Sequence, residues 1–93
     1  MLFECQSALV TGGSSGIGAA VAQALAAAGA KVAINYRSGH EAAEELASRI
    51  VGSGGEAFAI QADVSDEQAV DRMVLATVER FGRLDILDRK SVV

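Results

Sequence analysis

Short apolar runs alternate along this chain with longer stretches in which apolar residues recur every three or four positions. The short runs cover residues 7–11, 31–36, 57–62 and 84–87, and their length is typical of buried strands. The stretches between them have the spacing of amphipathic helices. Strands that alternate with helices in this way predict an α/β fold of the order βαβαβαβ, with a parallel sheet and right-handed crossovers.

Each of the three predicted helices has one apolar face. The first begins at Gly16 and ends at Gly29, and its predicted inward residues are Ile17, Ala20, Val21, Ala24, Leu25 and Ala28. The second ends at residues 52–55, and its predicted inward residues are Ala43, Leu46, Ala47, Ile50 and Val51. The third ends at Gly82, and its predicted inward residues are Val70, Met73, Val74, Val78 and Phe81. Ser38 with Glu41, and Ser65 with Gln68, match the capping-box pattern and predict the starts of the second and third helices.

Composition narrows the class of protein. The 93 residues, 51% of them hydrophobic, make one small domain or part of a larger one, and the net charge of −4 is dispersed without a basic block, which argues against a nucleic-acid partner. No apolar run is long enough for a membrane span, so we expect a cytoplasmic protein that does not bind a membrane. The single cysteine, Cys5, excludes an internal disulfide and a cysteine metal site.

The remaining candidates for metal or acid–base chemistry have simpler explanations. His40 is the only histidine and is interpreted as a solvated residue at a helix start. Glu41, Glu44 and Glu45 are interpreted as a solvated helical face. We therefore predict no metal site.

The strongest chemical signal is the segment VTGGSSGIG at residues 10–18, between the first strand and the first helix. Gly12, Gly16 and Gly18 would let a phosphate approach the backbone, and the N–H groups at the helix start would favour its negative charge. Ser14 and Ser15 would add hydroxyl donors. Glycines also occur in such turns for packing alone, but the position in the first strand-to-helix loop favours nucleotide phosphate binding.

The spacing of these residues resembles that of a known family. Thr11-Gly12-x-x-x-Gly16-Ile17-Gly18 is similar to the signature of the short-chain dehydrogenases/reductases (SDR), and ADVSD at 62–66 and FGRLDIL at 81–87 follow in the family's order. The resemblance covers residues 7–87, and VAINYRS resembles glucose-dehydrogenase-like and ketoacyl-reductase-like members. It implies the N-terminal half of a Rossmann-type doubly wound sheet and hydride transfer between NAD(P)(H) and an alcohol or carbonyl, with Ile17 among the cofactor-binding residues.

The end of the second strand bears on the choice of cofactor. An acid there would bind the ribose hydroxyls of NAD, but the resemblance places Tyr36 at that position. Arg37 could clamp a 2′-phosphate and Ser38 could donate a further hydrogen bond, so NADP(H) is favoured and NAD(H) stays possible. Arg37 could also be a solvated charge at a strand end.

A second candidate contact follows the third strand. The resemblance implies that Asp63 contacts the adenine amino group and that the backbone of Val64 adds to this contact. Asp63 could equally cap the turn into the third helix.

The family's catalytic groups are missing from this chain. The resemblance implies an Asn-Asn-Ala-Gly segment, a later serine and a Tyr-x-x-x-Lys pair, whereas the only tyrosine here, Tyr36, has His40 four residues on. No catalytic residue is named, and we expect this chain to be inactive by itself. A carbonyl or alcohol substrate and a homo-oligomeric assembly are expected only of the full-length enzyme. The alternatives are a stand-alone NADP(H)-binding module, or a chain that does not fold alone.

Residues 88–93, DRKSVV, depart from the family pattern. Three charges would be costly to bury in the middle of a sheet, so the fourth strand is predicted to stop at Leu87. The tail could be a solvated terminus of a short natural protein. We favour another interpretation, that residues 1–87 are the dinucleotide-binding half and that the tail is sequencing-adapter read-through. The DNA sequence GAT CGG AAG AGC GTC GTG, which is that of a widely used short-read sequencing adapter, encodes DRKSVV.

Overall fold

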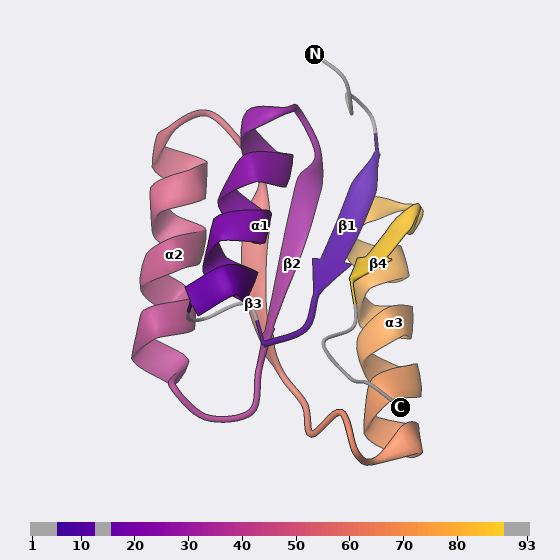
Figure 1. Ribbon diagram of the computed structural model, residues 1–93. Coiled ribbons are helices and arrows are strands. Elements are labelled where there is room, and N and C mark those ends of the chain that lie inside the picture. The colour runs from indigo at the N-terminus through magenta and orange to yellow at the C-terminus, as the bar shows by residue number, and fades with distance from the viewer. Residues whose placement is uncertain (1–5, 13–15, 89–93) are drawn as a thin grey trace.

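The computed structural model describes residues 6–12 and 16–88. In these residues four parallel strands form one sheet in the order β3-β2-β1-β4 (Figure 1). The strands are β1 (Ser7–Val10), β2 (Lys31–Tyr36), β3 (Ala57–Gln61) and β4 (Ile86–Asp88). This order is the first half of the doubly wound dinucleotide-binding sheet, so the predicted fold class is confirmed.

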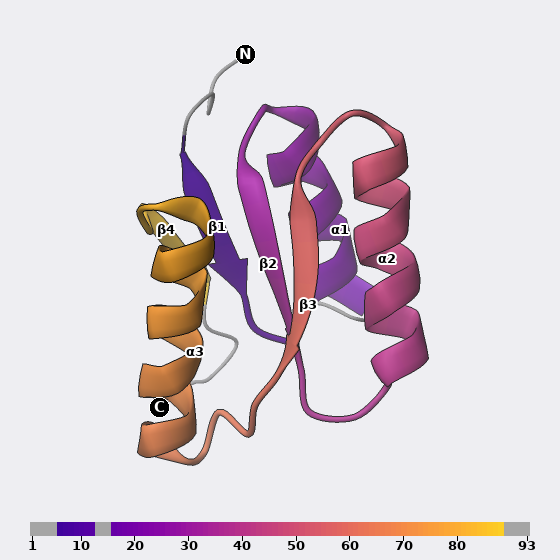
Figure 2. The ribbon, with the colours of Figure 1, turned by 180° about the vertical axis from the view of Figure 1, so that it is seen from behind.

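Three helices in the described part of the chain cover both faces of the sheet. They are α1 (Gly16–Ala27), α2 (His40–Gly52) and α3 (Glu67–Phe81). The two views show α1 and α2 against one face and α3 against the other (Figures 1 and 2). The result is a three-layer arrangement in which the central strands are buried from both sides.

The alternation of side chains along the strands divides the core into two clusters. Val10, Val32 and Ile34 point towards α1 and α2, where Leu46 and Ile50 meet them. On the opposite face Leu9 and Ala33 pack with residues of α3 and of the loop before it, namely Met73, Phe81 and Ala62. A strand buried on both faces reads as a continuous apolar run, which is why β1 and β2 could be located from the sequence.

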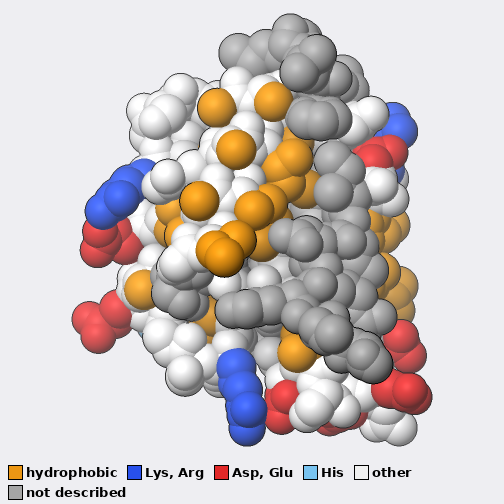
Figure 3. Space-filling view, viewed as in Figure 1, with side chains coloured by type: hydrophobic (Ala, Val, Ile, Leu, Met, Phe, Trp, Pro, Cys, Tyr) orange, Lys and Arg blue, Asp and Glu red, His pale blue; other side chains and the backbone are white. Residues whose placement is uncertain are grey.

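The predicted inward face of α1 is wrong at Ile17, Ala20 and Ala24, whereas Val21 and Leu25 do pack, partly buried, against the core. The buried residues of α1 are Gly18 and Ala22, whereas Ile17 is 81% exposed and Ala20 and Ala24 are exposed too. Hydrophobic side chains consequently gather on the outer surface over α1 (Figure 3). The helix is apolar almost all round, so its periodicity could not identify the side that contacts the sheet.

Two residues predicted to face inward on the other helices are also exposed. Val51 of α2 is 53% exposed and Val78 of α3 is 36% exposed. Each directly follows a buried residue, Ile50 and Thr77 respectively, and one residue along a helix turns about 100° around the axis. Both valines therefore lie on the flank of the buried stripe.

Neither predicted capping box forms, and the N-cap of each helix lies one residue later than predicted. The N-cap of α2 is Gly39, in the left-handed region at φ 84°, and it makes no side-chain cap hydrogen bond. The N-cap of α3 is Asp66, whose Oδ1 accepts hydrogen bonds from the backbone N–H groups of Gln68 and Ala69. Ser65 is not the cap because its hydroxyl and its N–H both donate to Asp63. The helix ends predicted at Gly29 and Gly82 are confirmed by their positive φ angles.

The strand boundaries differ slightly from the prediction. Strands β1 and β3 each end one residue early, and β4 starts at Ile86 and includes Asp88, which pairs with Val10. Asp88 was assigned to the tail, so the prediction that the strand stops at Leu87 is wrong. Backbone pairing does not depend on the side chain, so a charged residue can extend the strand. Cys5 and residues 89–93 lie outside the described residues.

Candidate dinucleotide-binding site

The three strand-to-helix loops leave the sheet at the same edge. The chain passes from β1 to α1, from β2 to α2 and from β3 to α3 at the carboxyl ends of the strands, at the bottom of Figure 1. Since β2 lies on one side of β1 and β4 on the other, the strand order reverses direction at β1. Ligands of open α/β sheets bind at this switch point, outside the carboxyl ends of the strands.

The glycine loop begins at this switch point. Gly12 and Gly16 have φ angles of 63° and 56°, which residues with a side chain rarely adopt. A Cβ atom built on Gly16 would meet nothing within 4 Å, so the space beside this residue is open. Gly18 is buried on the side of α1 that faces the sheet, and Ile17 points outward. Ser14 and Ser15 lie outside the described residues.

The electrostatics at the start of α1 suit an anion. The first turn of α1 contains no acidic residue, and the N–H groups at a helix start carry the positive end of the helix dipole. The backbone, the glycines and the open space at Gly16 together fit a pyrophosphate group.

Arg37 and Asp63 are brought together across β2 and β3. The Arg37 Nε lies 3.9 Å from Asp63 Oδ2, and the two side chains are 79% and 42% exposed. Gln61 fixes the start of the loop between β2 and α2, because its Nε2 donates to the Arg37 carbonyl oxygen at 3.2 Å. Ser38 is exposed and Val64 is half-buried beside them.

Asp63 also shapes its own turn. Its Oδ1 accepts hydrogen bonds from the Ser65 hydroxyl at 2.7 Å and from the Ser65 N–H at 2.9 Å. These two bonds, helped by Arg37, lower the pKa of Asp63 below its ordinary value despite some desolvation, and the carboxylate is charged near neutral pH. The turn role considered for Asp63 is therefore present in the structure. Oδ2 lies on the side of Arg37.

Asn35 is a site residue that the sequence did not reveal. It is 2% exposed in β2, its Oδ1 accepts the Gly12 N–H at 3.2 Å, and its Nδ2 donates to the carbonyl oxygens of Ala62 at 3.1 Å and Ile60 at 3.4 Å. One side chain thus joins the glycine loop to the end of β3. The available signal was a polar residue inside an apolar strand.

Tyr36 and His40 form a second contact that the sequence did not reveal. The Tyr36 hydroxyl and His40 Nδ1 are 2.7 Å apart, and the two rings meet edge to face with centroids 5.5 Å apart. Tyr36 is 8% exposed, whereas His40 is exposed at the first position of α2. His40 is thus at a helix start, as predicted, but it is also bonded to the preceding strand.

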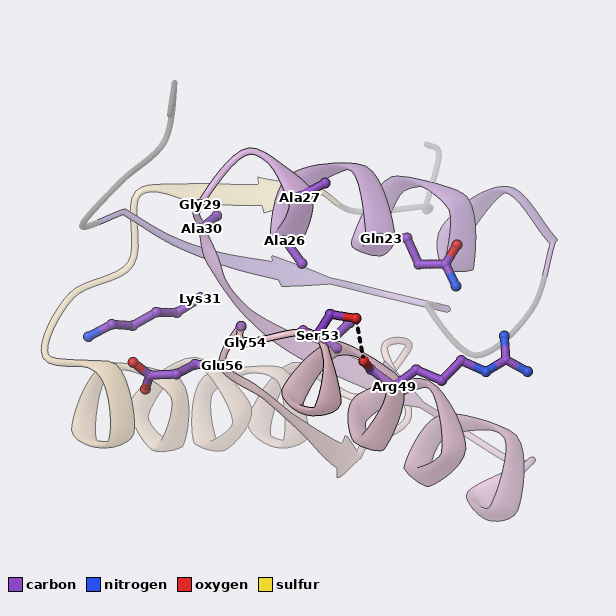
Figure 4. A pocket seen from close by; sticks show the side chains of 12 residues that line it. Gln23, Ala26, Ala27, Gly29, Ala30, Lys31, Arg49, Ser53, Gly54 and Glu56 are labelled. Atoms are coloured by element: carbon purple, nitrogen blue, oxygen red, sulfur yellow. Dashed lines mark hydrogen bonds between the residues drawn. The ribbon is translucent and has the colours of Figure 1, made fainter.

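A separate cavity of about 500 Å³ lies at the opposite end of the sheet (Figure 4). It is lined by the last turns of α1 and α2 and the segment that follows each, and Lys31, Arg49 and Glu56 are its charged residues. Helix C-terminal ends carry a negative partial charge, so this end of the molecule is less suited to a phosphate than the glycine loop.

The described residues contain neither a membrane-spanning helix nor a cluster of metal ligands. None of the helices in residues 6–12 and 16–88 combines the length and the apolar character that crossing a bilayer requires. In the same residues, His, Cys, Asp and Glu side chains form no group of three or more suited to a metal ion.

The strand order, the glycine loop and the shared edge define a Rossmann-type nucleotide-binding protein. The family model described as short chain dehydrogenase matches residues 6–90, so the chain belongs to this family. The predicted family membership is therefore confirmed.

Similar proteins are reductases and dehydrogenases of this family. A 3-oxoacyl-[acyl-carrier-protein] reductase of Synechocystis sp. is 48% identical over 82 residues, which are 88% of this chain and 33% of that reductase. The short-chain dehydrogenase/reductase homolog YusS of Bacillus subtilis is 51% identical over 80 residues, which are 86% of this chain and 73% of YusS. This chain thus spans about a third of the length of the Synechocystis reductase but most of YusS.

A solved structure agrees with the fold. The short chain dehydrogenase of Burkholderia cenocepacia in complex with NADP superposes with a TM-score of 0.91 at 49% identity. The match covers 94% of this chain and 36% of the Burkholderia chain.

Proposed function

We propose that this chain forms the cofactor-binding part of an NADP(H)-dependent short-chain oxidoreductase that transfers hydride between the cofactor and a carbonyl or alcohol. The observation that carries the proposal is the glycine loop at the switch point, with open space where Gly16 lacks a side chain. The pyrophosphate would be held by the N–H groups at the start of α1, between Gly12 and Gly18. Bound NADP(H) would supply the hydride chemistry.

The preference for NADP(H) rests on the end of β2. Tyr36 stands where an acid would bind the ribose of NAD, and its hydroxyl is directed to His40. Arg37 follows, and its guanidinium is largely exposed next to Asp63. A guanidinium can bind a 2′-phosphate through two hydrogen bonds, with Ser38 close by in the chain. The Burkholderia relative, which is named as a complex with NADP, supports this choice.

The chain by itself is proposed to bind cofactor without catalysis. Its only tyrosine, Tyr36, is buried and bonded to His40, and the sequence has no lysine four residues after it. A reductase needs a group that protonates the developing alkoxide, and none of the residues that the structure describes at this edge is placed for that role. The substrate and the oligomeric assembly would depend on residues outside this chain.

The cofactor proposal is tested by fluorescence titration of the purified chain with NADPH and NADH. We expect tighter binding of NADPH, and Arg37→Ala is expected to weaken NADPH binding about 10- to 100-fold, the loss associated with charged hydrogen bonds. Arg49→Ala is the matched control, since Arg49 is an exposed arginine that pairs with Glu45 on α2. Equal affinities for the two cofactors, unchanged by Arg37→Ala, would refute the NADP preference.

A second candidate is a stand-alone NADP(H)-binding module without catalysis. The observation that favours it is YusS, of which this chain covers 73%. Thermal melting tests it, because a ligand that binds only the folded chain raises the midpoint, with about 2.7 kcal/mol gained at 100 times the Kd. A midpoint that NADPH does not raise would exclude the module, and carbonyl reduction by this chain would exclude it in favour of a complete enzyme.

A further inference from the structure

Asn35 occupies an unusual position in the sheet. The pairing of β1 with β2 runs from Ser7–Lys31 to Val10–Ile34, whereas the pairing of β2 with β3 continues to Tyr36–Gln61. Asn35 therefore lies where β1 has already left β2. Its side chain takes over from the backbone at this point, because Oδ1 accepts the N–H of Gly12.

The amide group of Asn35 is satisfied on both sides. Besides the bond from Gly12, its Nδ2 donates to the carbonyl oxygens of Ala62 and Ile60. Burying an amide without partners is costly, and a residue that is 2% exposed has little access to water. These bonds hold the side chain in one orientation, which fixes the separation of the two loops that it touches.

The two loops belong to different parts of the proposed cofactor site. Gly12 opens the phosphate-binding loop, and Ala62 directly precedes Asp63, the residue assigned to the adenine side. The chain after Asn35 leads within two residues to Arg37, whose carbonyl oxygen accepts a bond from Gln61. Asn35 thus lies between the segments that would contact the pyrophosphate, the adenine and the 2′-phosphate.

We propose that Asn35 is a positioning residue that holds the glycine loop and the loop after β3 at the separation needed to bind both halves of the dinucleotide together. This inference rests on the proposed cofactor function. It assigns to Asn35 no contact with the cofactor. Loss of the Asn35 side chain should weaken the binding of ligands that contact both loops at once.

The test compares two probes. NADPH would contact both loops. Adenosine 2′,5′-bisphosphate keeps the 2′- and 5′-phosphates of the adenosine half but lacks the nicotinamide half and its phosphate, so its binding would depend mainly on the adenine side. Asn35→Asp keeps an acceptor for Gly12 and loses the donors to Ala62 and Ile60, and Asn35→Leu loses both. We expect each variant to weaken NADPH binding about 10-fold or more, and to weaken binding of the bisphosphate several-fold less.

Thr77→Val is the matched control for stability. Thr77 is fully buried in α3 and its hydroxyl donates to the Met73 carbonyl oxygen at 2.9 Å, away from the strand-to-helix edge. This variant should lower the melting temperature without changing either dissociation constant. If the Asn35 variants behave like Thr77→Val, or weaken both probes equally, the positioning role is wrong. If the unaltered chain does not bind NADPH, the cofactor proposal fails, and this inference with it.

Hydrogen exchange keeps the inference testable if the Asn35 variants do not fold. In the unaltered chain the Gly12 N–H should exchange slowly, because it donates to Asn35. An amide at Gly12 that exchanges as fast as an open loop would overturn the proposed contact.

Discussion

The hydrogen bond between Tyr36 and His40 makes a quantitative prediction about stability. Tyr36→Phe keeps the ring in its cluster next to Ala43 and Ala47 and removes only the hydroxyl. The lost bond is short, 2.7 Å between the hydroxyl oxygen and Nδ1, and the tyrosine is 8% exposed. A hydrogen bond of this kind contributes about 0.5–1.5 kcal/mol net. His40 is exposed and can turn to water, so we expect a loss near the middle of that range.

The assay is a double-mutant cycle in urea. The free energy of unfolding is measured for the unaltered chain, Tyr36→Phe, His40→Ala and the double variant. Tyr36→Phe should cost about 1 kcal/mol when His40 is present and close to nothing when His40 is replaced by alanine. In thermal melting 1 kcal/mol corresponds to about 4–8 °C for a domain of this size.

The alanine background is the control for this prediction. In it, the hydroxyl of Tyr36 has already lost its partner, so any remaining cost of Tyr36→Phe measures something other than the pair. Equal costs in both backgrounds would refute the contribution of the hydrogen bond to stability. In that case, the edge-to-face contact between the two rings would be the only interaction of Tyr36 with His40 that could still contribute to stability.

Two further predictions concern helix caps and acid stability. Asp66→Ala should destabilise the chain by about 0.5–2 kcal/mol in urea unfolding, because Asp66 caps α3. Ser65→Ala should destabilise it less. A larger loss for Ser65→Ala than for Asp66→Ala would instead support the capping box predicted from the sequence. The pKa values of Asp63 and Asp85 are lowered in the folded chain, that of Asp63 chiefly by hydrogen bonds from Ser65 and that of Asp85 chiefly by hydrogen bonds from Arg83. The two carboxylates therefore stabilise the fold at pH values above the ordinary pKa of 3.8, and this contribution is lost as the pH falls below it. Replacing both by asparagine should flatten the fall in stability as the pH is lowered below 3.8, measured by urea unfolding, and an unchanged slope would contradict this reasoning.

The elements that could be predicted from the sequence are those whose signal is local. The apolar runs of β1 and β2 and the glycines after α1 and α3 are such signals, and the order of elements then fixes the parallel, doubly wound sheet. The edge where the cofactor loops meet follows from this order alone. This is why Arg37 and Asp63 could be assigned to one region although 26 positions separate them, and the structure places them 3.9 Å apart.

The rest depended on side chains whose partners are distant in sequence or whose local signal was ambiguous. Asn35 and Gly12 are 23 positions apart, and nothing local to either residue indicates the bond between them. In α1, apolar periodicity correctly places Val21 and Leu25 against the core, but it also places Ile17 inward, whereas the fully buried positions are Gly18 and Ala22. Competition explains the displaced cap of α3, since Asp63 takes both donors of Ser65 and leaves Asp66 to cap the helix.

The arrangement of Arg37 and Asp63 suggests how the proposed preference for NADP(H) would arise. A pair separated by 3.9 Å, with both side chains substantially exposed, is weak in water. Asp63 is held in place by Ser65 and does not depend on Arg37 for its position. Arg37 can therefore turn towards a 2′-phosphate without disturbing the loop that would contact the adenine. The selectivity between NADPH and NADH would then come from the new bonds of Arg37, because NADH offers the guanidinium no phosphate at that position.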